Sequence, residues 1–230
     1  MSNSMGFGRW TVCTILLALV EPLLLYATVV AAQKDSPPST PPVAIATKVE
    51  KAPDLDGEVL EDPAWASAKP ASRFWQNTPD EGQPASERTE VRVIYTLDTI
   101  YFGVVCYDRD PDSIIVTDSL RDSSLDETDS FQIIVDTYLD RQNGFVFGTN
   151  PAAIEYDGQV VNEGEGGFGR RSGARNPRQT TQAGSGGGFN LNWDGSWEVR
   201  TRISEIGWSA EFAIPMRTLR FAGESPQTWG

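Results

Sequence analysis

The sequence contains no histidine, and this absence removes most of the common catalytic and metal-binding arrangements. A Ser-His-Asp or Cys-His nucleophile pair, a zinc-binding HExxH helix and imidazole acid–base catalysis all need that side chain. Zinc lacks its usual ligands too, since the exported chain would offer one cysteine and no histidine. Carboxylate chemistry, as in glycoside hydrolases, is the enzymatic route that stays open.

Cysteine is nearly absent as well, because the chain has only Cys13 and Cys106. Cys13 lies in an apolar N-terminal segment that export would remove, so the mature chain cannot form an intrachain disulfide. Cys106 follows Ile100, Phe102 and Val104 at a spacing of two residues, which is typical of a half-buried strand. We therefore expect a small buried hydrophobic residue at this position, with a reactive thiol as the alternative.

Basic residues are scarce relative to acidic ones. The chain holds 19 Lys and Arg against 32 Asp and Glu, which gives a formal net charge of −13. Such a surface repels the phosphates of nucleic acids and of anionic lipids, so neither is an expected partner. The excess of carboxylates is typical of a solvated surface, and it also offers oxygen ligands for calcium.

The longest apolar run lies near the N-terminus. Residues 11–32 are almost entirely apolar, and the small residues Val30-Ala31-Ala32 close the run. This pattern predicts a secretory signal peptide over residues 1–32, and hence a protein of the periplasm, outer membrane or cell surface. The alternative is an uncleaved anchor helix, in which Glu21 at mid-bilayer would cost a few kcal/mol.

Short alternating runs of apolar and polar residues follow. Residues 89–97 and 100–108 predict one hairpin. Residues 131–135 and 145–147 predict a second hairpin, with Asn143-Gly144 able to supply positive φ at its turn. In total, about nine to eleven short strands with almost no helix predict an all-β fold, an antiparallel and jelly-roll-like β-sandwich.

Three segments follow the signal peptide in the predicted organisation. Residues 33–42 are rich in Pro and Ser and predict an extended linker. The sandwich covers residues 43–230. Within it, residues 162–188 are rich in Gly and Arg with almost no apolar side chains, which predicts a long, mobile surface loop.

Seven tryptophans are many for a chain of 230 residues. Trp65, Trp197 and Trp208 lie in apolar or strand-like contexts, so we expect them in the core. Trp75 and Trp193 lie beside polar loop residues, where an indole face can stack on the C–H face of a sugar ring. The alternative for these two side chains is a partial cap of the core.

Two groups of carboxylates are candidates for chemistry. Asp136 and Asp140 flank the turn of the second hairpin, as candidate calcium ligands or as side chains that fix the turn. Asp126, Glu127 and Asp129 form the densest acidic run. A glycosidase needs two carboxyls held across a cleft, which proximity in sequence does not provide, so a solvated turn is the alternative for this run.

The order of motifs along the chain carries a resemblance to a known family. The motifs are LDG at residues 55–57, DPAW at residues 62–65, the two hairpins, and finally WDGSWEVRTRISEIGWSAEFAIPMRTLRF. The series resembles the family 9 carbohydrate-binding module domain at the N-terminus of large bacterial exported proteins, over about residues 43–230. The resemblance implies a non-catalytic β-sandwich, often with structural calcium. In xylanase-associated modules it implies that two tryptophans hold sugar chain ends, and in the large exported proteins that an outer-membrane β-barrel follows.

The leading hypothesis is therefore an exported, non-catalytic carbohydrate-binding domain, linked to catabolism of polysaccharides such as xylan, with a polysaccharide or oligosaccharide as partner. Its candidate ligand-binding residues are Trp75, Trp193 and Arg121, the last as a hydrogen-bond partner for hydroxyl groups. The alternatives are a structural periplasmic or surface module of an outer-membrane barrel protein, and a carboxylate glycosidase. The ending at Gly230 predicts a truncated chain, because proteins of the resembled type continue from such a Trp-Gly into further strands.

Overall fold

A computed structural model describes residues 42–162, 188–223 and 226–230 of the chain. The chain divides into two units, Met1–Lys34 and Asp35–Gly230, and every described residue belongs to the second. The predicted signal peptide, nearly all of the predicted linker and nearly all of the predicted mobile loop lie outside the described residues. No helix within the described part of the chain is long and apolar enough to cross a membrane.

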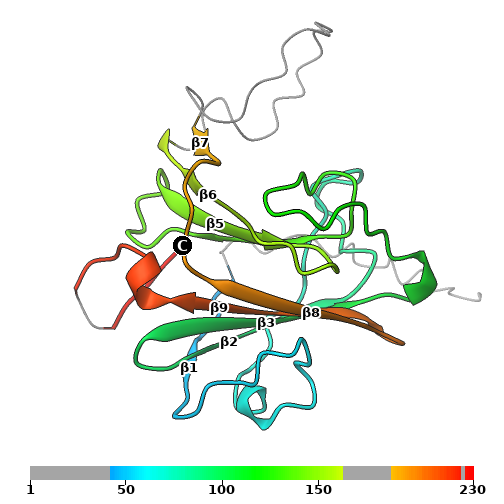
Figure 1. Cartoon of the computed structure of the whole chain (residues 1–230), viewed down its shortest axis with the longest axis horizontal. Helices are drawn as coiled ribbons and strands as arrows, with labels where there is room; N and C mark the ends of the chain where they lie inside the picture. The colour runs from blue at the N-terminus through cyan, green and yellow to red at the C-terminus, as the bar shows by residue number, and fades with distance from the viewer. Residues whose placement is uncertain (1–41, 163–187, 224–225) are drawn as a thin grey trace, which may run out of the picture. The chain divides into compact units, whose positions relative to one another are not determined.

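The described residues form two β-sheets (Figure 1). The strands are β1 (Thr47–Lys48), β2 (Thr89–Tyr95), β3 (Thr99–Tyr107), β4 (Phe131–Val135), β5 (Gly144–Thr149), β6 (Tyr156–Val160), β7 (Phe189–Asn190), β8 (Glu198–Ser204) and β9 (Gly207–Pro215). One sheet has the order β1-β2-β3-β9-β8, and the other has the order β4-β5-β6-β7. Among these described strands, β1 and β2 pair in parallel and the other neighbours pair antiparallel. The predicted all-β sandwich with very little helix is confirmed.

The main core lies between the two sheets and is rich in aromatic side chains. Trp197 stacks on Phe212 of β9 with ring centroids 5.7 Å apart, and it meets Phe147 of β5 edge-on at 5.2 Å. Such pairs contribute about 0.5–1.5 kcal/mol each beyond the burial of their area. Trp208 is buried in the same cluster, so Trp197 and Trp208 are core residues as predicted.

A second core lies on the opposite face of the five-stranded sheet. Residues 49–68, here named the N-terminal cap, pack Val59 and Trp65 against Ile94 of β2 and Val105 of β3. Trp65 is 1% exposed, which confirms its predicted place in the core. Because the cap covers one face and the four-stranded sheet covers the other, strand β9, which lies between β3 and β8, is buried almost throughout.

The predicted hairpin of residues 131–135 and 145–147 is present as β4 and β5, but its turn differs from the expected one. Val135 pairs with Phe145, and residues 136–143 form the loop between the two strands. Positive φ occurs at Leu139 (54°) and Arg141 (59°), and neither Asn143 nor Gly144 adopts it. The expectation of positive φ at Asn143-Gly144 is therefore wrong. Two aspartates, described below, hold the loop by accepting hydrogen bonds from its backbone amides.

Cys106 on β3 is half-buried, with a free thiol. Burial raises the pKa of this thiol to about 12, so it is protonated at neutral pH. A protonated thiol is a poor nucleophile. The structure thus favours the small hydrophobic residue over the reactive thiol.

Candidate functional site

The guanidinium group of Arg121 lies among four carboxylates. Its Nη1 donates to Glu155 Oε2 at 2.6 Å, and its Nη2 donates to Asp157 Oδ1 at 2.8 Å and to Asp194 Oδ1 at 2.6 Å. Asp122 Oδ2 lies 3.7 Å from Nε. These five residues, here named the Arg121 cluster, join the segment before β4, the start of β6 and the loop before β8.

Asp157 is the buried member of the Arg121 cluster. Its side chain is 1% exposed, and its second oxygen accepts a hydrogen bond from the backbone amide of Gly195 at 2.6 Å. Burial raises the pKa of Asp157, against the opposing effects of that hydrogen bond and of the positive charge on Arg121. Burial also raises the pKa of Glu155. A buried carboxylate needs a counter-charge, so Arg121 is held firmly in place.

Arg121 retains hydrogen-bonding capacity toward solvent. A guanidinium group carries five N–H donors, and three hydrogen bonds join this one to carboxylates within the described part of the chain. The N–H of Nε and one N–H of Nη1 make no hydrogen bond to any described residue. The Arg121 side chain is 41% exposed and the Asp194 side chain is 79% exposed. The cluster thus presents fixed donors and acceptors together at the surface.

Trp193 lies next to the Arg121 cluster, because it directly precedes Asp194. Its ring packs on Phe145 and Phe147 of β5, with centroid distances of 5.1 and 5.9 Å. The side chain is half-buried, so it caps the main core while part of it reaches the surface. The structure therefore brings together two of the three predicted ligand residues, Trp193 and Arg121, in one region.

Trp75 lies at a different place. It forms an isolated β-bridge with Pro84, and the segment before it pairs through Ala71 with Val91 on β2. This segment therefore follows the five-stranded sheet, whereas Trp193 packs on the four-stranded sheet. Two tryptophans that sandwich one ligand would have to face each other, and these contacts do not give Trp75 and Trp193 that arrangement.

The carboxylates of Asp136 and Asp140 hold the loop between β4 and β5. Asp136 accepts hydrogen bonds from three backbone amides, the shortest from Arg141 at 2.6 Å. Asp140 accepts from the amides of Gln142 and Asn143 at 2.7 and 2.8 Å. Among the residues that the structure describes, no group of three or more His, Cys, Asp or Glu side chains could hold a metal ion. Calcium at Asp136 and Asp140 stays a prediction.

The acidic run that was a candidate for glycosidase chemistry lies just before β4. Asp126 and Glu127 are exposed. Asp129 accepts a hydrogen bond from the amide of Ile115 at 2.6 Å, so its carboxylate fixes a loop. These contacts describe local structure, and a catalytic role for the run stays a prediction.

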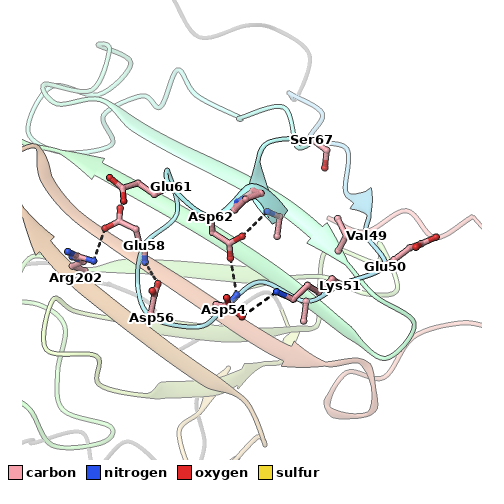
Figure 2. Close-up of a pocket in the computed structure, with 13 residues that line it drawn as sticks. Val49, Glu50, Lys51, Asp54, Asp56, Glu58, Glu61, Asp62, Ser67 and Arg202 are labelled. Atoms are coloured by element: carbon pink, nitrogen blue, oxygen red, sulfur yellow. Dashed lines mark hydrogen bonds and ion pairs between the residues drawn. The ribbon is translucent and has the colours of Figure 1, made fainter.

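An open pocket of about 610 Å³ lies over the N-terminal cap (Figure 2). Its acidic lining residues are Glu50, Asp54, Asp56, Glu58, Glu61 and Asp62. Several carboxylates in it are engaged already: Asp62 accepts from the amides of Asp54 and Ala64 at 2.9 and 2.8 Å, and Glu58 pairs with Arg202 at 2.9 Å. None of the described residues that line this pocket is aromatic, so they offer no face on which a sugar ring could stack.

Neither a protein-family model nor a curated protein matches the chain. One similar solved structure is a family 9 carbohydrate-binding module from Caldicellulosiruptor kristjanssonii in complex with cellotriose, at 14% identity and a TM-score of 0.41. That likeness covers 74% of this chain and 66% of the other, slightly less than two thirds of its length.

A second solved structure is similar to the same degree. It is a family 9 module from the same organism in complex with glucose, at 13% identity and a TM-score of 0.42, covering 78% of this chain and 72% of the other. Both solved structures are family 9 carbohydrate-binding modules to which this chain is similar in structure. At these values the likeness places no ligand and no binding residue on this chain.

Sequence reasoning proposed Arg121 as a ligand-binding residue and did not name its acidic partners Glu155, Asp157 and Asp194. The partners are 34, 36 and 73 residues away along the chain, so no local spacing joins them. One signal was present. An aspartate within a strand-like run, as at Asp157 of β6, is unusual for a sheet and indicates a buried charge with a partner.

Proposed function

We propose that this chain is a non-catalytic carbohydrate-binding domain whose ligand contacts the Arg121 cluster and Trp193. The observation that carries the proposal is the half-exposed guanidinium of Arg121, held by Glu155, Asp157 and Asp194. The residue before Asp194 is Trp193, whose indole is half-buried. Sugar hydroxyl groups both donate and accept hydrogen bonds, and the C–H faces of a sugar ring are apolar. An array of fixed donors and acceptors next to an aromatic surface matches both properties.

Preorganisation supports binding at this place. The ion pairs fix the Arg121 side chain before a ligand arrives, so less rotamer entropy is lost on binding than for a free arginine. Hydrogen bonds to an ionised group are also stronger than those between neutral groups. Asp194 offers an exposed, charged acceptor for a hydroxyl group at the same place.

Calorimetric titration with cello- and xylo-oligosaccharides tests the proposal. We expect a heat of binding for the full chain, weakened about tenfold by Asp194→Asn, because a charge-assisted hydrogen bond contributes about 1.5–3 kcal/mol. Asp126→Asn is the matched control, since Asp126 is exposed on a nearby loop outside the cluster. It should bind as the unmodified chain does.

The titration has a clear negative outcome. No heat with any glycan, with calcium present, would overturn the proposal and favour a structural module instead. If Asp194→Asn and Asp126→Asn weakened glycan affinity equally, the ligand would bind outside the Arg121 cluster. Turnover of aryl glycosides would favour the glycosidase hypothesis, with Asp126, Glu127 and Asp129 as the first residues to replace.

We also propose that the chain is exported and serves polysaccharide catabolism, with xylan as one substrate class. The apolar run of residues 11–32 supports export, and the motif resemblance supports the link to catabolism. Fractionation of cells that express the full chain tests export: we expect a product that is shorter than the full chain and lies outside the cytoplasm. Full-length product in the cytoplasm would contradict it.

A further inference from the structure

The Arg121 cluster carries more negative than positive charge. It holds one guanidinium group and four carboxylates, of which Asp157 is buried and Glu155 is half-buried. The other two are the more exposed ones, Asp194 at 79% and Asp122 at 44%. These two alone outnumber the single positive charge of Arg121. The cluster therefore presents an acidic surface to solvent, although an arginine lies at its centre.

Charged side chains beside the cluster do not offset this excess. Glu198 and Arg200 of β8 are both exposed and form an ion pair at 3.8 Å, so their charges cancel. The pKa of Tyr156 on β6 is raised by burial and then by the negative charges of Asp126 and Asp122. Asp126 thus adds negative charge to the same surroundings.

The exposed carboxylates lie where a ligand of Arg121 would meet them. Asp194 accepts from Nη2 at 2.6 Å, and Asp122 lies 3.7 Å from Nε, so the two flank the guanidinium group. A ligand atom that accepts a hydrogen bond from Arg121 lies within about one Debye length, roughly 8 Å, of both carboxylates. A charge on the ligand is therefore only partly screened from them by salt.

Given the proposed sugar site, on which this inference rests, we propose that the Arg121 cluster selects its glycan by charge: amino sugars bind more tightly than neutral sugars, and uronic acids bind most weakly. The ammonium group of an amino sugar donates to Asp194. That carboxylate has room for it, because a carboxylate accepts about four hydrogen bonds and Arg121 supplies one. A sugar carboxylate at the same place meets like charges that outnumber the guanidinium group. A neutral hydroxyl group takes no part in either effect.

Three trisaccharides that differ in one substituent on each ring test the selection. They are cellotriose, the glucosamine trimer, which has an amine in place of one hydroxyl group, and the glucuronic acid trimer, which has a carboxylate in place of the hydroxymethyl group. Because every ring carries the change, the result does not depend on which ring lies at the cluster.

Calorimetric titration at low ionic strength with calcium present is the readout. At pH 6, where an amine with a pKa of about 7.7 is protonated, we expect the glucosamine trimer to bind about tenfold more tightly than cellotriose. We expect the glucuronic acid trimer to bind about tenfold more weakly than cellotriose. At pH 9 the amine is neutral, so its advantage should disappear. The chain has no histidine that would titrate between these pH values.

Two variants locate the effect at the cluster. Asp194→Asn and Asp122→Asn each remove one negative charge, and asparagine tolerates the positive φ of 61° at residue 122. We expect each substitution to reduce the tenfold preference for the glucosamine trimer to about threefold. Glu61→Gln is the matched control, because it removes one negative charge at an exposed position on the N-terminal cap. It should keep the full preference.

The outcomes separate this selection from the proposed sugar site. Binding of cellotriose without a preference for the glucosamine trimer would overturn the charge selection alone. A preference that survives both cluster variants, or that falls as much in Glu61→Gln, would also overturn it, because the amine would then bind elsewhere on the acidic surface. No heat with any of the three trisaccharides would overturn both proposals.

Discussion

At the scale of single residues, Glu211 explains why several of the sequence motifs occur together. It is fully buried on β9, and its Oε2 accepts hydrogen bonds from the amides of Asp56 and Gly57 at 2.9 and 2.8 Å. Its Oε1 accepts from Trp65 Nε1 at 2.8 Å. One carboxylate thus fastens the LDG and DPAW segments of the N-terminal cap to the sheet. These motifs identify a scaffold rather than a binding site.

Gly57 is required at its position for two reasons. Its φ is +87°, and a Cβ atom there would lie 2.6 Å from the backbone carbon of Thr201. We predict that Gly57→Ala lowers the free energy of unfolding by about 2–4 kcal/mol in urea titrations, because backbone cannot give way as a side chain would. Gly223→Ala is the matched control, since nothing lies within 4 Å of its added Cβ. Equal stabilities of the two variants would contradict the prediction.

Replacing Glu211 by glutamine should destabilise the protein, although the two side chains have the same shape. All three partners of the carboxylate are donors, so the amide N–H₂ of glutamine would face a donor. We predict a loss of about 1–3 kcal/mol for Glu211→Gln in chemical unfolding. Trp65→Phe removes the indole donor, so the loss for Glu211→Gln should be smaller in the Trp65→Phe background. Additive losses would show that the indole N–H does not matter.

Glu211 also carries a pH dependence whose sign follows from its burial. Burial raises the pKa of Glu211 above its ordinary value of 4.5, so the folded state binds the proton more tightly than the unfolded state does. The stability that this shift contributes is complete below the ordinary pKa and is lost as the pH rises through the raised value. We predict that Glu211→Gln lacks this decline, as comparison of unfolding curves between pH 4 and pH 7 would show. Parallel pH profiles for the two proteins would be evidence against it.

At the scale of elements, the loop between β4 and β5 shows side chains taking over the role of turn residues. Residues with positive φ here are Leu139 and Arg141, which lack the conformational freedom of glycine. The carboxylates of Asp136 and Asp140 accept hydrogen bonds from backbone amides that have no partner in a strand, and these bonds stabilise the loop. Stabilisation of the loop is therefore a sufficient reason for the polar side chains Asp136 and Asp140 in this hairpin.

Asp136→Asn tests that explanation together with the calcium prediction. Asparagine has one acceptor oxygen in place of two, so at least one backbone amide would lose its partner. We predict that the substitution lowers the free energy of unfolding by about 1–2 kcal/mol when it is measured with EDTA present. A higher melting temperature in calcium than in EDTA, lost in the variant, would support calcium at Asp136 and Asp140. The same melting temperature in both buffers would leave only the role in the loop.

At the scale of the whole described domain, the Arg121 cluster connects segments that are far apart in the chain. Arg121 precedes β4, Asp157 lies on β6 of the four-stranded sheet, and Asp194 precedes β8 of the five-stranded sheet. The hydrogen bonds of the cluster therefore link the four-stranded sheet to the segment that leads into the five-stranded sheet. Its stabilising effect depends on the buried carboxylate, because an exposed ion pair alone contributes at most about 1 kcal/mol.

Removal of Arg121 would leave Asp157 buried without its counter-charge. We predict that Arg121→Ala lowers the free energy of unfolding at pH 7 by about 3 kcal/mol. The pKa of Asp157, which burial already raises, would rise further, so the variant should recover stability as the pH falls from 7 to 5. Unfolding curves at the two pH values measure this recovery. The double variant Arg121→Ala with Asp157→Asn should be more stable at pH 7 than Arg121→Ala alone; an equal loss at both pH values would contradict the prediction.

Features that depend on local pattern were predictable from the sequence. Alternation with a period of two made the strands and the all-β class predictable, and apolar contexts identified Trp65, Trp197 and Trp208 as core residues. The tertiary structure alone decided which charges meet, because Arg121 and Asp194 are 73 residues apart and neither has a local pattern. It also decided that Trp193 packs on the four-stranded sheet, whereas the segment before Trp75 pairs with the five-stranded sheet, and that the loop between β4 and β5 is held by carboxylates. Periodicity is a property of neighbours along the chain, whereas a binding surface is assembled from side chains that only the packed sheets bring together.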